Sequence, residues 1–246
     1  MRTLKLTVSY DGTNYVGWQR QINGVSVQQV IEEAFAPLVG GVAPTIAGAS
    51  RTDAGVHALG QVASVNTETE LSVTAVWRAL NVRLPADIRI VSVEEAPLGF
   101  HARFRSVAKS YRYRMVTAQV LPPFDRWYAW HAPEPKKIEW MRDAAARMVG
   151  RHDFASFQAR GAYVKDTVRT IHRLELHEQG DEIQIECDGD GFLRHMVRAI
   201  AGTLAEVGTG LRTASSISGI LQAKDRRAAG ATAPACGLTL VGVRYC

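Results

Sequence analysis

The chain has 246 residues, of which 46% are hydrophobic and 22% charged, with a net charge of +5. This length and balance are typical of a globular protein with a substantial core, in one large domain or two small ones. No apolar run approaches the ~18 residues of a membrane span, and the opening residues alternate polar and apolar side chains as a strand does, unlike a signal peptide.

Cysteine and histidine usage narrows the class of protein further. The three cysteines are scattered and include no C-x-x-C pair, which favours the reducing cytoplasm over a disulfide framework or a zinc site. The seven histidines lack metal-ligand spacings such as H-E-x-x-H, so no metal is expected. The basic excess fits either simple solubility or a polyanionic partner whose phosphates attract Lys and Arg.

The first half of the chain predicts strands alternating with helices. Alternating apolar residues predict strands over residues 3–10, 43–49, 61–66 and 88–94. Ser26 and Gln29 have the spacing of a capping box, and Gly40 ends the helix that they begin. Ser72 is predicted to cap a second helix over residues 73–83. The Arg- and Phe-rich stretch 97–108 is predicted to be a connector.

The second half shows a similar pattern without a repeat of sequence. It predicts strands at 110–116, 168–177, 182–188 and 238–245, and helices at 138–149, 192–207 and 213–222. Helices packed on mixed, mostly antiparallel sheets give an α+β fold of two related α/β lobes, residues 1–108 and 109–246. A central cleft between the lobes is the expected place for an active site.

The segment Ala49–Ala58 reads ASRTDAGVHA and lies between two predicted strands, where functional side chains concentrate. Arg51 and Asp53 leave an extended chain on the same side, so the guanidinium is expected to keep the carboxylate ionised, as a nucleophile or base requires. The spacing alone favours a turn-capping aspartate with a surface arginine. It likewise favours a structural hydrogen-bonding role for His57 over a general base.

Motifs along the whole chain resemble those of the TruA family of pseudouridine synthases. The string RTDAGVH at residues 51–57 resembles the family's signature, and its K-x-Y-x-Y strand is matched from Lys109 to Tyr113. The remaining matches, in family order, are Tyr10–Thr13, Gly17–Arg20, Val27–Gln29 with Glu32, His152–Phe154, Gly191–Leu193, Met196–Arg198, Gly202–Leu204, and Ala233-Pro234 through Gly237-Leu238. Chance supplies any one of these but hardly the ordered set.

The resemblance implies the pseudouridine synthase fold and an isomerase. Family members convert uridine to pseudouridine in the tRNA anticodon stem-loop, at positions 38, 39 and 40, without cofactor or metal. They are homodimers, so a second copy is an expected partner beside tRNA, with no membrane and a cytoplasmic location. By the same resemblance, Asp53 is the catalytic carboxylate and its charge stabilises the electron-poor sugar that appears as the base departs.

The resemblance also assigns roles in substrate binding. Tyr111 stacks on the target base and its hydroxyl serves proton transfer, whereas Tyr113 suits an ordinary strand position. Arg198 pairs with Asp53, Arg51 fills the space left by the extruded base, and Leu238 packs beneath the base. The candidates for phosphate contacts are Arg103, Arg105, Lys109, Arg112, Arg114, Lys165 and Arg169.

Three alternatives remain from the residues. One is the same chemistry on another RNA, and a second is a catalytically silent RNA-binding protein, which an intact Arg51-Asp53-Tyr111-Arg198 set disfavours. The third, an aspartyl hydrolase, needs a second equivalent Asp loop, and the sequence has none. Nucleotide binding is poorly supported because neither a G-x-x-x-x-G-K-[ST] nor a complete G-x-G-x-x-G motif is present.

Overall fold

The computed structural model describes residues 1–134, 136–161 and 164–246, and their contacts divide them into two compact units. The first unit is Met1–Val107 with Leu240–Cys246, and the second is Ala108–Thr239. The start of the second unit lies one residue from the predicted lobe boundary. The C-terminal residues, predicted with the second lobe, pack instead with the first.

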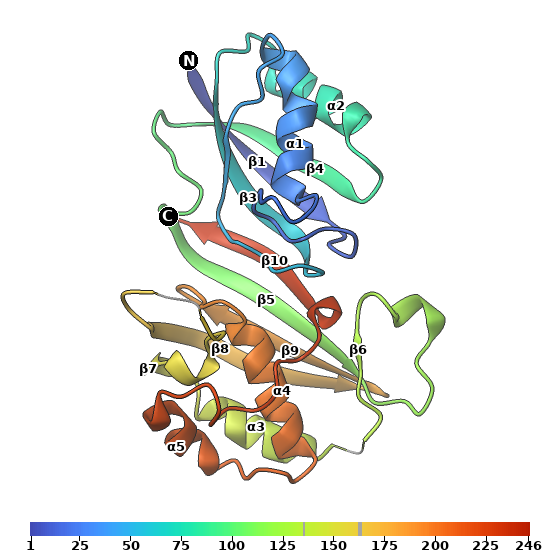
Figure 1. Cartoon of the computed structure of the whole chain (residues 1–246), viewed down its shortest axis with the longest axis vertical. Helices are drawn as coiled ribbons and strands as arrows, with labels where there is room; N and C mark the ends of the chain where they lie inside the picture. Colours follow the sequence, from blue (N-terminus) through green and yellow to red (C-terminus); the bar gives the residue numbers. More distant parts are fainter. Residues whose placement is uncertain (135, 162–163) are drawn as a thin grey trace. The chain divides into compact units, whose positions relative to one another are not determined.

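The first unit is a sheet covered by two helices (Figure 1). Its strand order is β4-β1-β3-β10, with β2 beside β3, and the pairings of β1 with β3 and β4 are antiparallel. The elements are β1 (Arg2–Tyr10), α1 (Val27–Phe35), β2 (Ile46–Gly48), β3 (His57–Thr67), α2 (Val73–Arg83), β4 (Ile88–Ala96) and the part of β10 (Leu238–Tyr245) that begins at Leu240.

The C-terminal strand joins the first unit through Tyr245. Its hydroxyl donates to the Ala102 carbonyl oxygen at 2.8 Å, and its ring packs on Phe100 with 5.2 Å between the centroids. The Lys5 ammonium lies 5.5 Å from the same ring. These long-range contacts, which no local pattern encodes, explain why the chain end leaves the unit that precedes it in sequence.

The second unit has helices on a sheet of order β5-β9-β8-β7, with β6 beside β5 (Figure 1). The β5–β9, β8–β9 and β7–β8 pairings are antiparallel and β5–β6 is parallel. The elements are β5 (Ser106–Val116), β6 (Trp130–His131), α3 (Ile138–Ala146), β7 (Gly150–Asp153), β8 (Val168–Gln179), β9 (Glu182–Gly189), α4 (Met196–Gly208) and α5 (Ser216–Ala223).

Local signals explain the two helices of the first unit. The Ser26 and Ser72 hydroxyls accept from the backbone N–H groups of Gln29 and Ala75, both at 3.2 Å, as predicted. The capping box at α1 is only half made, because the Gln29 side chain donates to Glu33 at 2.9 Å instead of turning back to the cap. The buried faces of both helices then complete the core over β1, where Leu4, Leu6 and Val8 are fully buried.

Several predicted boundaries were wrong. Helix α4 begins at Met196, four residues later than expected, because His195 has a left-handed backbone (φ 63°) that a continuing helix does not allow. Strand β3 begins at His57, well before the predicted start, and β2 is shorter than expected. Strand β5 begins inside the predicted connector, and the short strands β6 and β7 were not predicted.

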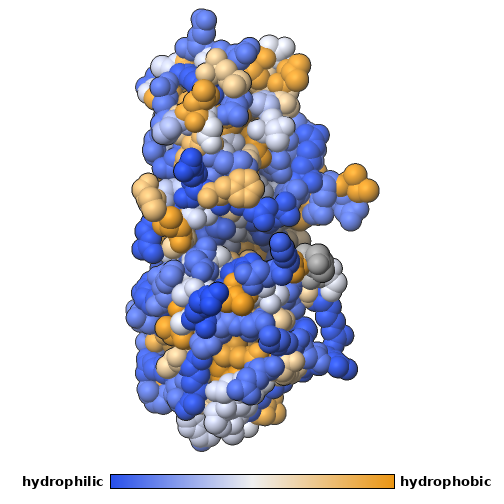
Figure 2. Space-filling view, turned by 90° about the vertical axis from the view of Figure 1, so that its left-hand side faces the viewer, coloured by the Kyte–Doolittle hydropathy of each residue, from blue (hydrophilic) through white to orange (hydrophobic). Residues whose placement is uncertain are grey.

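The face of the molecule drawn in Figure 2 is mainly polar. On the face drawn in Figure 2, hydrophilic residues predominate and hydrophobic ones form small separate groups. Among the described residues, no helix is long and apolar enough to cross a membrane.

Candidate active site

Asp53 lies in the loop between β2 and β3, which we call the Asp53 loop (residues 49–56). Asp53 is half-buried, Thr52 is buried and Arg51 is exposed. The loop therefore presents its one carboxylate at the surface of a rigid framework, as a catalytic loop does.

Hydrogen bonds hold the Asp53 loop at both ends and in the middle. The fully buried Gln61 side chain accepts from the Ser50 N–H at 3.1 Å and donates to the Ser50 carbonyl oxygen at 2.7 Å. The Thr52 hydroxyl bonds the Tyr10 hydroxyl at 2.7 Å, and the Thr52 carbonyl accepts from the Trp18 N–H at 3.1 Å. The residue next to Asp53 is thus fixed through both side chain and backbone, which pre-positions the carboxylate.

Two glycines let the chain approach the Asp53 loop closely. Gly17 has φ +102°, and a Cβ there would lie 2.5 Å from the Thr52 carbonyl oxygen and 3.0 Å from the Asp53 carbonyl carbon. Gly55 turns the loop with φ +75° and donates its N–H to the Tyr15 carbonyl at 3.3 Å. Only glycine meets both demands at residue 17, the positive φ and the missing side chain.

His57 ties the far end of the loop to the end of β1. It is buried, and its Nδ1 accepts from the Gly12 N–H at 3.1 Å and lies 3.1 Å from Asp11 Oδ1. The Gly12 backbone also packs tightly here, since a Cβ on Gly12 would lie 2.0 Å from the Val56 carbonyl oxygen. These contacts support the structural role that the spacing favoured for His57.

Arg51 and Asp53 lie two residues apart in the Asp53 loop. Arg51 is exposed, whereas Asp53 is half-buried. The chain turns at Ala54 and Gly55, after Asp53, and the orienting role of Arg51 stays a prediction.

Tyr111 and Tyr113 lie on the same face of β5 in different surroundings. The Tyr113 ring is fully buried and its hydroxyl donates to the Pro234 carbonyl at 2.8 Å. Burial raises the pKa of Tyr113, so its hydroxyl stays protonated. The Tyr111 ring is 6% exposed and meets Phe192 edge-on, with 5.1 Å between centroids. The burial and hydrogen bond of Tyr113 fit the ordinary structural role predicted for it. The packing on Phe192 holds the Tyr111 ring in one orientation.

Arg198 projects from the first turn of α4 and is held by the segment before β10. Its Nε donates to the Ala233 carbonyl at 2.8 Å, while the Ala233 N–H donates to the Arg198 carbonyl at 3.1 Å. Leu238 is the buried first residue of β10. The preceding Gly237 packs so closely that a Cβ there would lie 2.7 Å from the Tyr113 ring. The segment 233–238 therefore connects Arg198, Tyr113 and Leu238 within the second unit.

Two of the predicted phosphate contacts, Arg112 and Arg114, also have acidic partners within the chain. Arg112 pairs with Glu186 at 3.1 Å, and Arg114 pairs with Glu182 at 2.8 Å and with Asp125 at 2.9 Å. Hydrogen bonding to Glu182 raises the pKa of Arg114 and lowers that of the glutamate. These carboxylates come from β9 and from the loop after β5, so a pattern within β5 does not reveal them.

The other candidates for phosphate contacts are mostly exposed. Arg169 donates to the backbone carbonyls of Asp166 and Val168. Arg103, Arg105 and Lys165 are exposed, and Lys109 is half-buried. For these residues phosphate binding stays a prediction.

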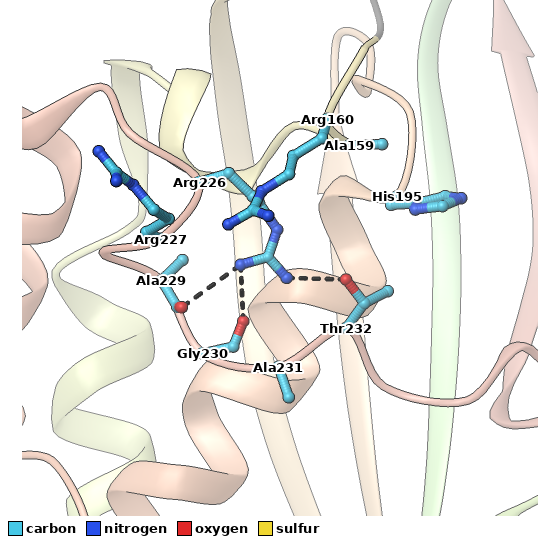
Figure 3. A pocket seen from close by; sticks show the side chains of 9 residues that line it. All are labelled: Ala159, Arg160, His195, Arg226, Arg227, Ala229, Gly230, Ala231 and Thr232. Carbon is cyan, nitrogen blue, oxygen red and sulfur yellow. Dashed lines mark hydrogen bonds between the residues drawn. The ribbon is translucent and has the colours of Figure 1, made fainter.

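A pocket in the second unit was missed by the sequence reasoning. Arg160, Arg226, Arg227 and His195 line it with small residues of the segment 229–232 (Figure 3). The adjacent pair Arg226-Arg227 is the sequence signal that points there, but Arg160 is distant in sequence and joins them only in the fold. We call this cavity the arginine pocket.

A family model described as tRNA pseudouridine synthase matches residues 6–105 and 144–246, which is most of the chain. The chain belongs to this family. A protein named tRNA pseudouridine synthase A from Geotalea uraniireducens (strain Rf4) is 45% identical over 245 residues, covering 100% of both chains. Its namesake from Geobacter sp. (strain M21) is 43% identical over 246 residues, covering 100% of this chain and 99% of the other. The resemblance inferred from the motifs is confirmed.

A further relative agrees with this membership, and one solved structure is only distantly similar. The protein of the same name from Thermoanaerobacter sp. (strain X514) is 43% identical over 245 residues, with full coverage of both chains. A crystal structure of a Cbf5–Nop10–Gar1 complex aligns with 82% of this chain and 44% of that one, at 10% identity and a TM-score of 0.38. The α+β class with mostly antiparallel strands, as predicted, is the fold observed.

Proposed function

We propose that this chain isomerises uridine to pseudouridine at positions 38, 39 and 40 of the tRNA anticodon stem-loop, with Asp53 as its catalytic carboxylate. The observation that carries the proposal is the Asp53 loop: a half-buried carboxylate within the RTDAGVH string, next to a doubly fixed Thr52. Full-length similarity to proteins named tRNA pseudouridine synthase A supports the substrate.

The chemistry needs no group beyond the protein's own side chains. The bond between C1′ of the ribose and N1 of the uracil breaks, the base turns, and a C–C bond forms between C1′ and C5. C5 then loses its proton and N1 gains one, so the isomerisation is balanced without another reactant. As the base departs, the sugar becomes electron-poor, and a fixed carboxylate stabilises that charge where water is excluded. Asp53 attacks or assists at this stage.

The second unit contributes three of the four substrate-binding residues in this proposal, and the first unit contributes Arg51. Tyr111 stacks on the uracil, and its hydroxyl moves a proton; the edge contact with Phe192 keeps the ring from turning. Arg198 pairs with Asp53. Its bond to Ala233 uses one of the five guanidinium N–H donors and fixes the plane of the group. Arg51 occupies the space left by the extruded base, and Leu238 packs beneath the base itself.

The partners in this proposal are tRNA and a second copy of the chain, in the cytoplasm. The net charge of +5 favours a polyanionic partner. The three cysteines are unpaired thiols, which suits a reducing compartment. The proposed homodimer rests on the family resemblance.

The direct test is to incubate purified protein with an unmodified tRNA transcript and to map pseudouridine by carbodiimide-based primer extension. We expect marks at positions 38–40 with the wild type and none with Asp53→Ala, although the variant still binds tRNA. Marks elsewhere in RNA would support the same chemistry on another substrate. Binding without any mark would support a silent RNA-binding protein and contradict the enzyme proposal.

A further inference from the structure

The arginine pocket is a cavity of about 450 Å³ in the second unit, and its lining is strongly basic. Three arginines and a histidine contribute to its lining, from segments that are far apart in sequence. In Figure 3 the Arg160 side chain reaches toward Arg226, so the two guanidinium groups lie near each other. Like charges gathered in a cavity repel one another unless an anion lies between them.

Arg226 is held in place by the protein. One terminal nitrogen donates to the Gly230 carbonyl at 2.8 Å and the Ala229 carbonyl at 3.3 Å, and the other donates to the Thr232 hydroxyl at 2.7 Å. Burial and then the neighbouring charge of Arg160 lower the pKa of Arg226. An arginine remains charged at neutral pH all the same. The pocket thus contains a fixed, half-buried positive charge.

The nearby carboxylates are already engaged with other groups. Asp225 pairs with Arg227 at 2.7 Å. One oxygen of Glu206 accepts from Arg212 at 2.5 Å and the other from the Ala231 N–H at 2.7 Å. In the described part of the chain, no ion pair is formed by Arg160 or by Arg226. These two arginines give the pocket its positive excess.

The pocket is adjacent to Arg198 through continuous backbone. Its wall at Ala231 and Thr232 leads directly to Ala233, which exchanges two hydrogen bonds with Arg198. On the other side, the Ala159 N–H donates to the Arg194 carbonyl at 2.9 Å, next to His195 and the start of α4. A ligand in the pocket would therefore contact the chain segment that also holds Arg198, a residue of the proposed active site.

We propose that the arginine pocket binds a backbone phosphate of the substrate RNA close to the modified nucleotide, with Arg160 and Arg226 as its main contacts. The inference rests on the proposed function, because that function brings an RNA strand to Arg198. Guanidinium groups match phosphate oxygens with forked hydrogen bonds, and phosphate contacts set the position of a nucleic acid without reading its sequence. Such a contact holds the strand in register while the target base leaves its stack.

Arg160 is the residue to change, because it is exposed and its removal leaves the carbonyl groups around Arg226 satisfied. For Arg160→Ala we expect the Kd for tRNA to rise about tenfold, the loss of one charge-assisted phosphate contact. The slope of log Kd against log salt should fall by about 1. The loss should appear in Kd and KM more than in kcat. Arg160→Lys keeps the charge but not the fork, so its affinity should be intermediate.

The matched control is Arg78→Ala, which removes an exposed arginine from α2 that forms no ion pair with any described residue. It should retain the wild-type Kd, salt slope and activity. Arg226→Lys is the second pocket variant, with its melting temperature measured beside its Kd because Arg226 also holds the 229–232 segment.

The outcomes separate the pocket from the enzyme. If Arg160→Ala weakens binding and lowers the salt slope but wild type forms no pseudouridine, the pocket stands and the proposed function fails. If wild type modifies tRNA and Arg160→Ala keeps the wild-type Kd and slope, the function stands and the pocket proposal is overturned. Equal losses in Arg160→Ala and Arg78→Ala would also overturn it, because net charge alone would then account for both.

Discussion

In the first unit, Asp53 lies on a loop shaped by hydrogen bonds and glycines, whereas in the second unit Tyr111 and Arg198 project from a strand and a helix. The carboxylate is placed by contacts to Ser50, Thr52 and Gly55, all outside regular structure. Tyr111 is placed by burial and ring packing. The Asp53 loop of the first unit is therefore sensitive to small polar and backbone changes, and Tyr111 of the second unit to changes in shape.

The pair Tyr111 and Tyr113 sharpens this comparison most, because two neighbouring tyrosines on one strand should respond in opposite ways. Tyr111→Phe should lower kcat by about 10²-fold or more, since it removes a proton-transferring hydroxyl. Tyr113→Phe should keep kcat but lose about 1–2 kcal/mol of unfolding free energy, since the Pro234 carbonyl loses its donor. Single-turnover kinetics and urea titrations on both variants test this; equal effects on kcat would contradict it.

Gly17→Ala tests the close approach at the Asp53 loop. The added methyl group would lie 2.5 Å from the Thr52 carbonyl oxygen, so the Thr52–Asp53 peptide must move. A displacement of about 1 Å at a reacting group costs about 10²-fold in rate. The readout is kcat at saturating tRNA.

The matched control for Gly17→Ala is Gly41→Ala. Gly41 has a similar φ of +93° but has no atom within 4 Å of the added Cβ. It should lose about 1–2 kcal/mol of stability from the left-handed backbone and retain full activity. If both variants lose activity equally, backbone strain and not the contact with the Asp53 loop is the cause.

A smaller effect is expected from the hydroxyl pair behind the loop. Thr52→Val removes the 2.7 Å bond to Tyr10 and keeps the side-chain shape, so we expect about a tenfold fall in kcat and about 1 kcal/mol less stability. Tyr10→Phe should give a similar loss, and the double variant little more, because both single changes break the same bond. Fully additive losses in this cycle would show that the bond does not couple the two residues.

The smallest expected effect is on the stability of the second unit, and it is measured as the pH dependence of the free energy of unfolding. Arg114 lowers the pKa of Glu182 in the folded state, so the carboxylate adds stability above its ordinary pKa of about 4.3 and that contribution is lost as pH falls through the folded value. Glu182→Gln should therefore cost about 1 kcal/mol at pH 7, and the difference from wild type should shrink toward pH 3. Urea titrations at several pH values measure it.

The control for the pH experiment is Glu178→Gln, an exposed position on the neighbouring strand β8. It should match wild type at every pH. If Glu182→Gln is less stable than wild type by the same amount from pH 7 to pH 3, the ionised Glu182 carboxylate does not contribute the pH-dependent stability described.

The sequence predicted the features that local chemistry determines. The Ser26 and Ser72 caps, the alternating strand β1 and the loop carrying Asp53 all depend on residues within a few positions of one another. The left-handed His195 that delays α4 was not predictable, since a non-glycine residue seldom adopts that backbone.

The features that were missed depend on long-range register. The sequence indicated Arg112 and Arg114 only as candidates for phosphate contacts, and the pairing of β5 with β9 brings glutamates beside them. The arginine pocket likewise needs residue 160 beside 226. Tertiary packing, which a single sequence does not display, decides such neighbours.

The most direct test of the account is the single-turnover rate of Asp53→Asn with enzyme in excess over an unmodified tRNA transcript, measured together with its Kd. Asparagine keeps the size of the side chain and removes the charge, so the Asp53 loop should keep its shape. We predict that the Kd stays near the wild-type value and that pseudouridine formation falls by more than about 10⁴-fold. A rate within about tenfold of wild type, the factor expected for a minor positioning effect, would show that the Asp53 carboxylate does not carry the reaction.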